Sequence, residues 1–170
     1  METEYFVIGE TSFHGQLSYK DSVITTASPV MLLVGNSQLT LDGSLDFSNY
    51  EMDIIADLEN ADIQLVNQFL PGNFNSGKAT GRMQISGEYI APSANAELNC
   101  NNIVYGKFFL ESIEFNSKLY VNDGIKNGVV GLKVGKGTWE NNSFQSGTFD
   151  ATIDNEKVIV ENCHFKSGKD

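Results

Sequence analysis

The sequence predicts an all-β fold, and three observations support that prediction. Apolar residues fall on alternate positions over most of the 170 residues, as they do in strands with one buried face. Asn, Asp and Gly pairs separate these runs, and the 16 glycines suit a fold with many tight corners. A hydrophobic content of 41% is enough to build a core, which argues against extensive disorder.

The clearest predicted strand covers residues 39–47, where large apolar residues alternate with Thr, Asp and Ser. Further strands are predicted at 83–89, 94–100, 113–121, 132–134, 149–153 and 158–165, and in the N-terminal third at 5–8, 17–19 and 30–34. In the last C-terminal run, Cys163 and Phe165 fall one step out of register with Val158 and Val160. That slip predicts a β-bulge or a bend.

Short turn signals separate the predicted strands. Asp123-Gly124 is a hairpin signal, and Asn127-Gly128 close behind it predicts a turn wider than two residues. Four more turns are predicted at Asn49-Tyr50, Asn101-Asn102, Asn141-Asn142 and Asp154-Asn155.

One segment departs from the strand pattern. Residues 60–70, NADIQLVNQFL, place Ile, Val and Leu on one helical face, with Asn60 or Asp62 as a cap and Pro71-Gly72 as a stop. We therefore expect one short helix near 61–70, at one end of the sheet.

Charge and motifs argue against several functions. The net charge of −11 repels nucleic acid, so we expect no nucleic-acid partner. A calcium site is one hypothesis for the acidic residues that fall close together here, but the alternation favours the solvent face of strands. These residues are Asp42, Asp46, Asp53, Asp57, Glu59 and Asp62. His14 and His164 are the only histidines, and no nucleophile, acid–base or metal motif accompanies them. We expect no enzyme, no cofactor and no metal.

The two cysteines, Cys100 and Cys163, have no C-x-x-C spacing. We favour two small apolar residues on inward faces over a disulfide, although the sequence leaves their pairing open. No apolar run reaches the roughly 18 residues of a membrane helix, and the acidic start at Met1 is not that of a signal peptide. The protein is either cytosolic or a piece of a longer chain.

An alternating strand exposes an apolar face that must be covered. A second sheet, closure into a barrel, or curling into a trough filled by a ligand would each cover it. The periodicity leaves all three open.

Residues 77–87, GKATGRMQISG, have the form G-x-x-x-G-x-[LM]-x-I-x-G and are followed by Pro92 and the strand 94–100. This unit resembles one that recurs in the AsmA-like family, which includes TamB. Residues 39–72 are similar to the strand-turn-strand and short helix that precede such units. The resemblance covers about residues 35–168.

The resemblance implies a curled β-sheet groove (β-taco) of amphipathic strands with an apolar interior. It implies phospholipid transport between the inner and outer membranes and support of outer-membrane assembly. The partners it implies are a phospholipid or other acyl-chain ligand and an outer-membrane assembly-type barrel protein. The parent protein would be anchored in the inner membrane and cross the periplasm. Residues 1–170 would then be a single groove segment excised from that chain, without the anchor, and its exposed edge strands would favour self-association.

The candidate groove lining is the apolar register of the predicted strands. It comprises Leu39, Leu41, Leu45, Phe47, Met83, Ile85, Tyr89, Ala96, Leu98, Ile113, Phe115, Leu119 and Val121. An ordinary dry core would need the same residues.

Two alternative functions stay open at this point. The similar segments NSFQSG (142–147) and NCHFKSG (162–168) favour a right-handed β-helix or β-solenoid for adhesion or glycan binding. A barrel or sandwich enzyme has the least support.

Overall fold

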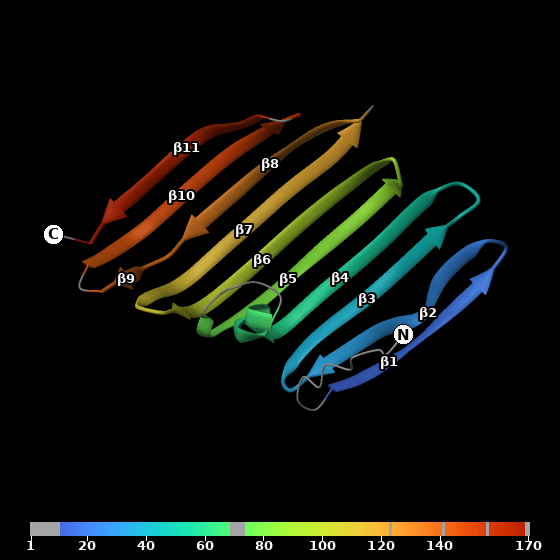
Figure 1. The fold of residues 1–170 in the computed structure, drawn as a ribbon, viewed down its shortest axis with the longest axis horizontal. Coiled ribbons are helices and arrows are strands. Elements are labelled where there is room, and N and C mark those ends of the chain that lie inside the picture. The colour runs from blue at the N-terminus through green and yellow to red at the C-terminus, as the bar shows by residue number, and fades with distance from the viewer. Residues whose placement is uncertain (1–10, 69–73, 123, 141, 156, 169–170) are drawn as a thin grey trace.

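The computed structural model describes residues 11–68, 74–122, 124–140, 142–155 and 157–168, which form one antiparallel sheet and one short helical segment (Figure 1). The strands follow one another as a meander from β1 to β8 and then to β10 and β11, while the short β9 pairs with β10 and β7. This confirms the all-β prediction. Because the described strands pair antiparallel throughout, the right-handed β-helix, whose coils pair in parallel, is excluded.

The described elements have the following bounds. They are β1 Thr11–Lys20, β2 Val23–Val34, β3 Ser37–Asp46, β4 Glu51–Asp62, η1 Ile63–Gln68, β5 Phe74–Glu88, β6 Ala91–Tyr105, β7 Phe108–Asn122, β8 Ile125–Val134, β9 Gly137–Trp139, β10 Asn142–Asp154 and β11 Lys157–Ser167. The predicted strand at 5–8 lies outside the described residues, as do Asp123, the Pro71-Gly72 stop and Asn141 of the turn predicted at Asn141-Asn142.

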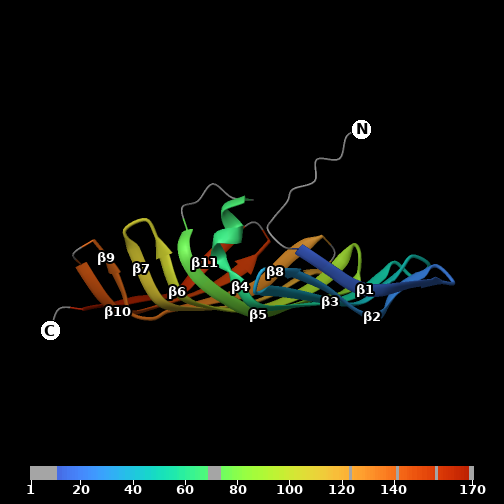
Figure 2. The ribbon, with the colours of Figure 1, turned by 90° about the horizontal axis from the view of Figure 1, so that it is seen from below.

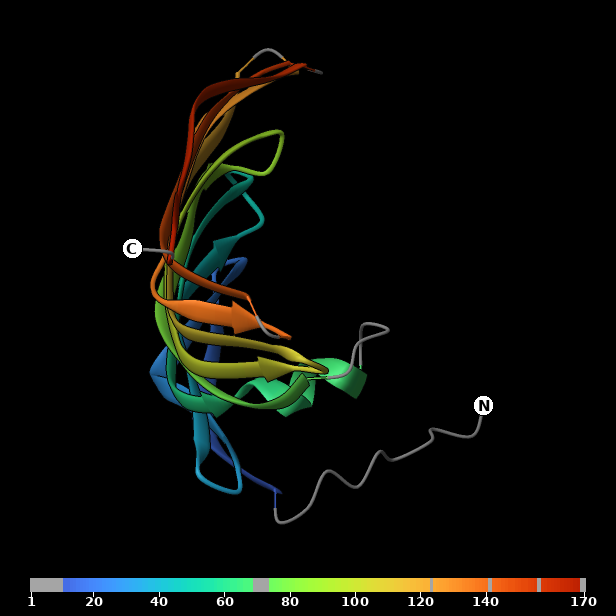
Figure 3. The same cartoon turned by 90° about the vertical axis from the view of Figure 1, so that its left-hand side faces the viewer.

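The sheet is a single layer that curls along its strands. Figure 2 shows one thin layer, and Figure 3 shows a curve with η1 on its inner side. In the described part of the chain no second sheet covers either face, and no side chain is less than 2% exposed. Of the three ways to cover the apolar face, the chain therefore uses curling, which confirms the curled-sheet prediction.

Cross-strand register sorts the side chains onto two unlike faces. One apolar row runs through Leu39, Leu58, Gly81, Leu98, Phe115, Leu132, Phe149 and Cys163, and the next through Leu41, Ala56, Met83, Ala96, Ser117, Val130, Ala151 and Val160. The rows between them are mostly polar, for example Thr40, Asp57, Arg82, Glu97 and Asn116. We call the apolar side, on which η1 packs, the inner face, and the polar side the outer face.

Glycine within a strand makes room for a large residue opposite. A Cβ on Gly128 would lie 2.4 Å from the Lys118 carbonyl oxygen and 2.6 Å from Cδ2 of Leu119, whose side chain lies over this glycine. Asn127 and Gly128 lie inside β8, so the prediction of a turn wider than two residues is wrong. The predicted hairpin is confirmed, because Asn122 pairs with Ile125.

Two other predicted turns are confirmed. Tyr50 and Asn155 have φ of 58° and 56° at the corners after β3 and β10. The Asp46 carboxylate accepts hydrogen bonds from Ser48 and Asn49 at the first corner. The hydrogen bond from the Ser48 hydroxyl, followed by that from the backbone N–H of Asn49, lowers the pKa of Asp46.

A line of irregular positions, which we call the crease, crosses the sheet from β4 to β10. It comprises Glu59-Asn60, Asn101-Asn102, Glu111-Ser112, Gly135-Lys136 and Gln145-Ser146. Asn60 and Asn102 have positive φ there, 50° and 52°, so Asn101-Asn102 forms a bulge and not the predicted turn.

The crease keeps the inner face apolar where the sheet bends. Across it, inner-face residues are three positions apart along a strand instead of two, as with Cys100 and Ile103, or Ile113 and Leu110. The lower ends of the central strands turn inward toward η1 (Figure 3). The bulges therefore allow the bend without exposing the apolar residues on the far side of it.

The helix predicted near 61–70 is a 3₁₀ helix whose described part is Ile63–Gln68. The backbone N–H of Gln64 donates to Oδ1 of Asp62 over 3.1 Å, so Asp62 is the cap and Asn60 belongs to the crease. Asn67 ties the segment to the start of β5 through two hydrogen bonds with the backbone of Phe74, at 2.8 and 3.1 Å. Ile63 is 8% exposed and packs against the inner face.

The bulge predicted in the last strand is also confirmed. Asp150 pairs with Asn162 and the next residue, Ala151, pairs with Val160, which leaves Glu161 as the additional residue of β11. The slip moves Cys163 and Phe165 onto the inner face with Val160.

We predict that Gly43→Ala destabilises the sheet by about 3 kcal/mol, because Gly43 has φ +143° and its new Cβ would lie 2.0 Å from the Asp53 carbonyl oxygen. Gly106→Ala is the matched control, since Gly106 also has positive φ (+57°) but no atom within 4 Å, and about 1 kcal/mol is expected. Urea unfolding measures both. Equal losses would contradict the close approach of β3 and β4.

Candidate functional site: the inner face of the sheet

The structure brings the predicted groove lining together on one surface. All of those residues lie in inner-face rows of β3, β5, β6 and β7, except Phe47 and Tyr89. These two lie in the corners that follow β3 and β5, where their ring centroids are 6.5 Å apart. They therefore lie at the margin of the inner face.

The inner face is packed at its crease end. A cluster of Ala61, Ile63, Ala79, Cys100, Ile103 and Leu110 is buried there, and Phe74, Phe108 and Phe144 pack against it. Ile103 is the most buried member of this cluster at 4% exposure. Leu98 and Ile113 of the predicted lining also pack against this cluster, so at these two positions the dry-core interpretation fits best.

Beyond the crease the inner face lies open. Leu41, Met83 and Leu119 are 36%, 42% and 36% exposed, although they sit on strands with neighbours on both sides. Such exposure of large apolar side chains in the middle of a sheet follows from the missing second layer. This open part of the inner face is the candidate binding surface.

The open part contains an apolar hollow of about 440 Å³ over β1 to β4. It is lined by Phe13, Leu17, Ile24, Val30, Leu41, Leu45 and Ile54, with Thr26 and residues 42–44 at its base. Gly43 has no side chain to fill the hollow, and β2 bulges between Thr25 and Val30. Both features leave the surface recessed at this point. Leu41 and Leu45 were predicted site residues.

Sequence reasoning missed the other lining residues of the hollow. In β2 the segment Ala27-Ser28-Pro29 interrupts the alternation, so Ile24 and Val30 do not appear as one apolar face. In β4 the inner residue Ile54 is followed directly by Ile55, which hides the period of two. The pairing register with β3 is the signal that shows which residues of β2 and β4 lie on the inner face.

The polar groups at the base of the hollow satisfy one another. The Thr26 hydroxyl donates to the Asp42 carboxylate and accepts from the Gly43 amide over 3.0 Å. No hydrogen-bonding group is thereby offered to a ligand from this base. The hollow therefore suits a ligand that is itself apolar.

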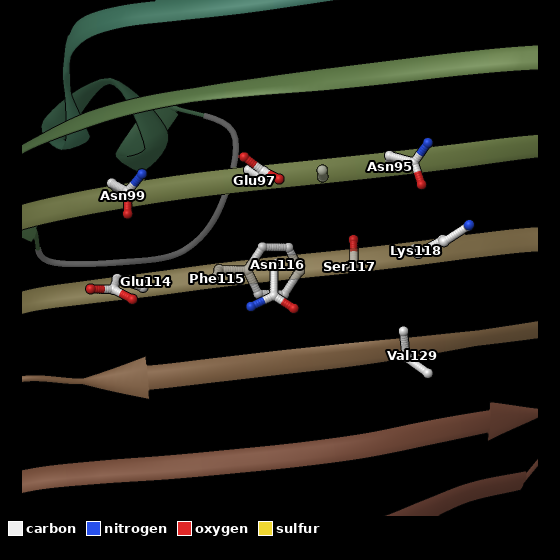
Figure 4. Close-up of a pocket in the computed structure, with 10 residues that line it drawn as sticks. Asn95, Glu97, Asn99, Glu114, Phe115, Asn116, Ser117, Lys118 and Val129 are labelled. Atoms are coloured by element: carbon white, nitrogen blue, oxygen red, sulfur yellow. The ribbon is translucent and has the colours of Figure 1, made fainter.

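The outer face is polar and is hollowed differently. A shallow depression of about 520 Å³ over β6, β7 and β8 is lined by Asn95, Glu97, Asn99, Asn116 and Lys118, among others (Figure 4). Exposed ion pairs join neighbouring strands on this face, such as Arg82 of β5 with Asp57 of β4 at 3.5 Å. Exposed pairs of this kind add little stability.

The acidic residues between 42 and 62 mostly lie in outer-face rows of β3 and β4, where the solvent-face interpretation placed them. In the described part of the chain no three His, Cys, Asp or Glu side chains are placed to hold a metal ion.

Both cysteines occupy inner-face positions, as predicted, and both are free thiols. Cys100 lies in β6 within the packed cluster, whereas Cys163 lies in the edge strand β11 and is exposed. Burial raises the pKa of the Cys100 thiol above its ordinary value. Three strands separate the two residues, which at roughly 4.8 Å per strand is far beyond disulfide reach.

A single-layer antiparallel sheet with an open apolar inner face and a polar outer face defines the class of protein, an open amphipathic β-groove. A model of the TamB N-terminal domain family matches residues 10–157. The chain therefore belongs to the TamB family. The match begins earlier than the motif resemblance at residue 35 and ends where β11 begins.

This family assignment indicates a protein of the cell envelope, in a family that is a structural and transport module and not a known enzyme family. Searches of curated proteins and of solved structures return no match to the chain. Within the described residues, no helix has the length and hydropathy that crossing a membrane requires.

We predict that thiol reagents label Cys163 at least about 10-fold faster than Cys100, because Cys163 is exposed, whereas Cys100 is buried and its raised pKa leaves less of the thiolate that attacks the reagent. Mass spectrometry of alkylated peptides measures both rates, and raising the pH or adding urea should accelerate Cys100. A Cys163→Ser variant isolates the slow thiol. Equal labelling in the folded chain would contradict the packing of the crease end.

Proposed function

We propose that this chain is a segment of a hydrophobic groove that shelters the acyl chains of phospholipid during transport between the inner and outer membranes. The observation that supports this proposal is the open part of the inner face, where large apolar side chains on central strands are exposed to solvent. Soluble proteins rarely leave such a contiguous patch uncovered unless it binds something. The family assignment is consistent with this role.

The dimensions suit acyl chains. Strands β5, β6 and β7 have 15 residues each, which at about 3.3 Å per residue is roughly 50 Å. Each methylene removed from water contributes about 0.8 kcal/mol, so a sheltered chain of ordinary length gains on the order of 10 kcal/mol as an upper limit.

Apolar contacts allow a bound lipid to move along the groove. The base of the hollow is satisfied internally, and the remaining contacts are apolar, so no single polar anchor fixes a ligand in place. Moving an acyl chain by one methylene exchanges similar contacts at little cost. Many weak apolar contacts therefore hold the lipid and still let it slide.

The setting of the segment is part of the same proposal. The charged outer face fits an aqueous compartment, which we assign to the periplasm, with the parent protein anchored in the inner membrane. Support of outer-membrane assembly, through a barrel protein of the assembly type, completes the proposed role. The packed region along the crease closes one side of the groove, so that lipid enters over the open part.

We predict that Met83→Arg and Leu41→Arg each lower co-purifying phospholipid by at least about 5-fold, because an acyl chain would have to desolvate the guanidinium. Both positions are partly exposed, so the cation reaches water and the sheet folds. Native mass spectrometry and lipid extraction from the same sample measure the occupancy.

Val129→Arg is the matched control for this experiment. Val129 is 52% exposed on a central strand, but it lies in the outer-face row between Lys118 and Thr152. Its phospholipid content should equal that of the unaltered chain. If folded inner-face variants retained full lipid content, or the control lost it equally, the groove proposal would fail.

A further inference from the structure

Four aromatic residues lie in one row across the inward-turned ends of the central strands, on the opposite side of the crease from the open part. Tyr105 of β6 pairs with Phe74 of β5 on one side and with Phe108 of β7 on the other. Phe108 in turn pairs with Trp139 of β9. Residues that pair directly across neighbouring strands point to the same face of a sheet. We call these four residues the aromatic row, and it follows the lower margin of the sheet in Figure 1.

The rings of the aromatic row differ in exposure. Phe74 and Phe108 pack against the buried inner-face cluster, so the row lies on the inner face. The Phe74 and Tyr105 rings meet edge to face with their centroids 5.1 Å apart, and Phe108 stacks on Phe144 at 5.9 Å. Tyr105 and Trp139 are nevertheless 44% and 63% exposed. The row therefore presents two exposed rings that rest on two partly buried ones.

An ion pair lies beside the row. Nζ of Lys107 donates to Oε1 of Glu140 at 2.9 Å, and the Glu140 backbone N–H donates to the Lys107 carbonyl oxygen at 3.3 Å. These residues directly adjoin Phe108 and Trp139 in the sequence, so the two hydrogen bonds fix the positions of both rings. The Lys107 and Glu140 side chains stay 77% and 52% exposed, so the ammonium retains N–H groups and the carboxylate retains acceptor positions for a ligand.

We propose that the aromatic row binds an uncharged, β-1,4-linked glycan whose sugar rings stack on Tyr105 and Trp139. A sugar ring has C–H groups on its faces and hydroxyl groups around its edge, which suits an aromatic surface with hydrogen-bonding groups beside it. Tyr105 and Trp139 lie two strands apart, which at about 4.8 Å per strand is roughly 10 Å. That separation matches the repeat of two sugar units in an extended β-1,4-linked chain.

The charges at the site favour an uncharged glycan over an acidic one. The chain as a whole carries −11 and repels polyanions. Lys107 and Glu140 neutralise each other, so the pair can donate to and accept from hydroxyl groups without selecting a charged ligand. The site thus combines hydrogen-bonding capacity with no net charge of its own.

A membrane surface fits the aromatic row less well. Trp and Tyr are also enriched where proteins meet the membrane interface. The row, however, lies on the inner side of a curved sheet, beside η1 (Figure 3). A flat bilayer does not follow such a concave surface, whereas a single glycan chain does.

The aromatic row is separate from the proposed lipid groove. Ile103 and Leu110, which are 4% and 6% exposed, form the next inner-face row and lie between the aromatic row and the open part. Glycan binding therefore goes beyond the proposed function and does not depend on bound lipid. The four residues are distant in the sequence, so the pairing register is the signal that brings them together.

Trp139 is the single tryptophan of the chain, so its fluorescence reports binding at the row directly. The probes are soluble β-1,4-linked oligomers of N-acetylglucosamine with one to six units, titrated into delipidated protein. Four strands span three spacings, or about 14 Å, so the affinity should rise at least about 10-fold between one and three units and then level off. Oligomers of α-1,4-linked glucose, whose chains coil, should bind at least about 10-fold more weakly than β-1,4-linked oligomers of equal length.

Tyr105→Ala should weaken binding of the β-1,4-linked trimer at least about 5-fold, because one stacked ring is lost. Tyr120→Ala is the matched control, since Tyr120 is 46% exposed but lies in an outer-face row of β7. Trp139→Ala, followed by isothermal titration calorimetry, should also lose at least about 10-fold in affinity. Circular dichroism checks that each variant keeps its sheet, and Trp139→Ala supplies the test if Tyr105→Ala does not fold.

Unchanged Trp139 fluorescence with every glycan would overturn the inference, as would an equal loss of binding in Tyr105→Ala and Tyr120→Ala. A fluorescence change with phosphatidylcholine vesicles alone would also overturn it and assign the row to a membrane surface. The phospholipid content of Tyr105→Ala should equal that of the unaltered chain. Because lipid and glycan are measured separately, failure of either proposal leaves the other standing.

Discussion

A single-layer sheet has to be held together without a packed second layer, and the cross-strand rows of the inner face meet that constraint. On the central strands, inner residues pair with residues of the same row on both neighbouring strands, and glycines such as Gly128 leave room for the side chain of the facing residue. Backbone hydrogen bonds between neighbouring strands supply the rest of the stabilisation. Because this stabilisation lies within the layer, the surface above it can stay open.

The crease gives the open face its shape. Bulges at Asn60 and Asn102 and the break at Gly135-Lys136 shift the alternation by one residue, so that the apolar side remains inside as the strands bend. The inner-face residues beside the crease form a buried cluster with Ile63 of η1, whereas Leu41, Met83 and Leu119, which lie farther from the crease, stay exposed. One fold thereby combines a closed end that anchors the structure with an open surface available to a ligand.

The strand pattern was predictable wherever alternation is clean, as at residues 39–47, and even the bulge beside Glu161 could be predicted from the slip at Cys163. The errors have a local cause. Asn and Gly serve turns and in-strand close approaches alike, so Asn101-Asn102 and Asn127-Gly128 looked like corners. Pro29 and its neighbours hid the face of β2 that lines the hollow. Periodicity also describes one strand at a time, so it could not show that the inner face stays uncovered.

The central claim is that acyl chains lie on the inner face and not on the outer one. Photo-crosslinking in the presence of phospholipid tests it directly, with a benzophenone side chain placed in turn at Leu41, Met83 and Leu119 and at the following or preceding outer residues Asp42, Gln84 and Lys118. Mass spectrometry then counts lipid adducts. Adducts at the inner positions, with few at the residues beside them, are the predicted result. Equal adducts on both faces, or none at the inner positions, would contradict the account.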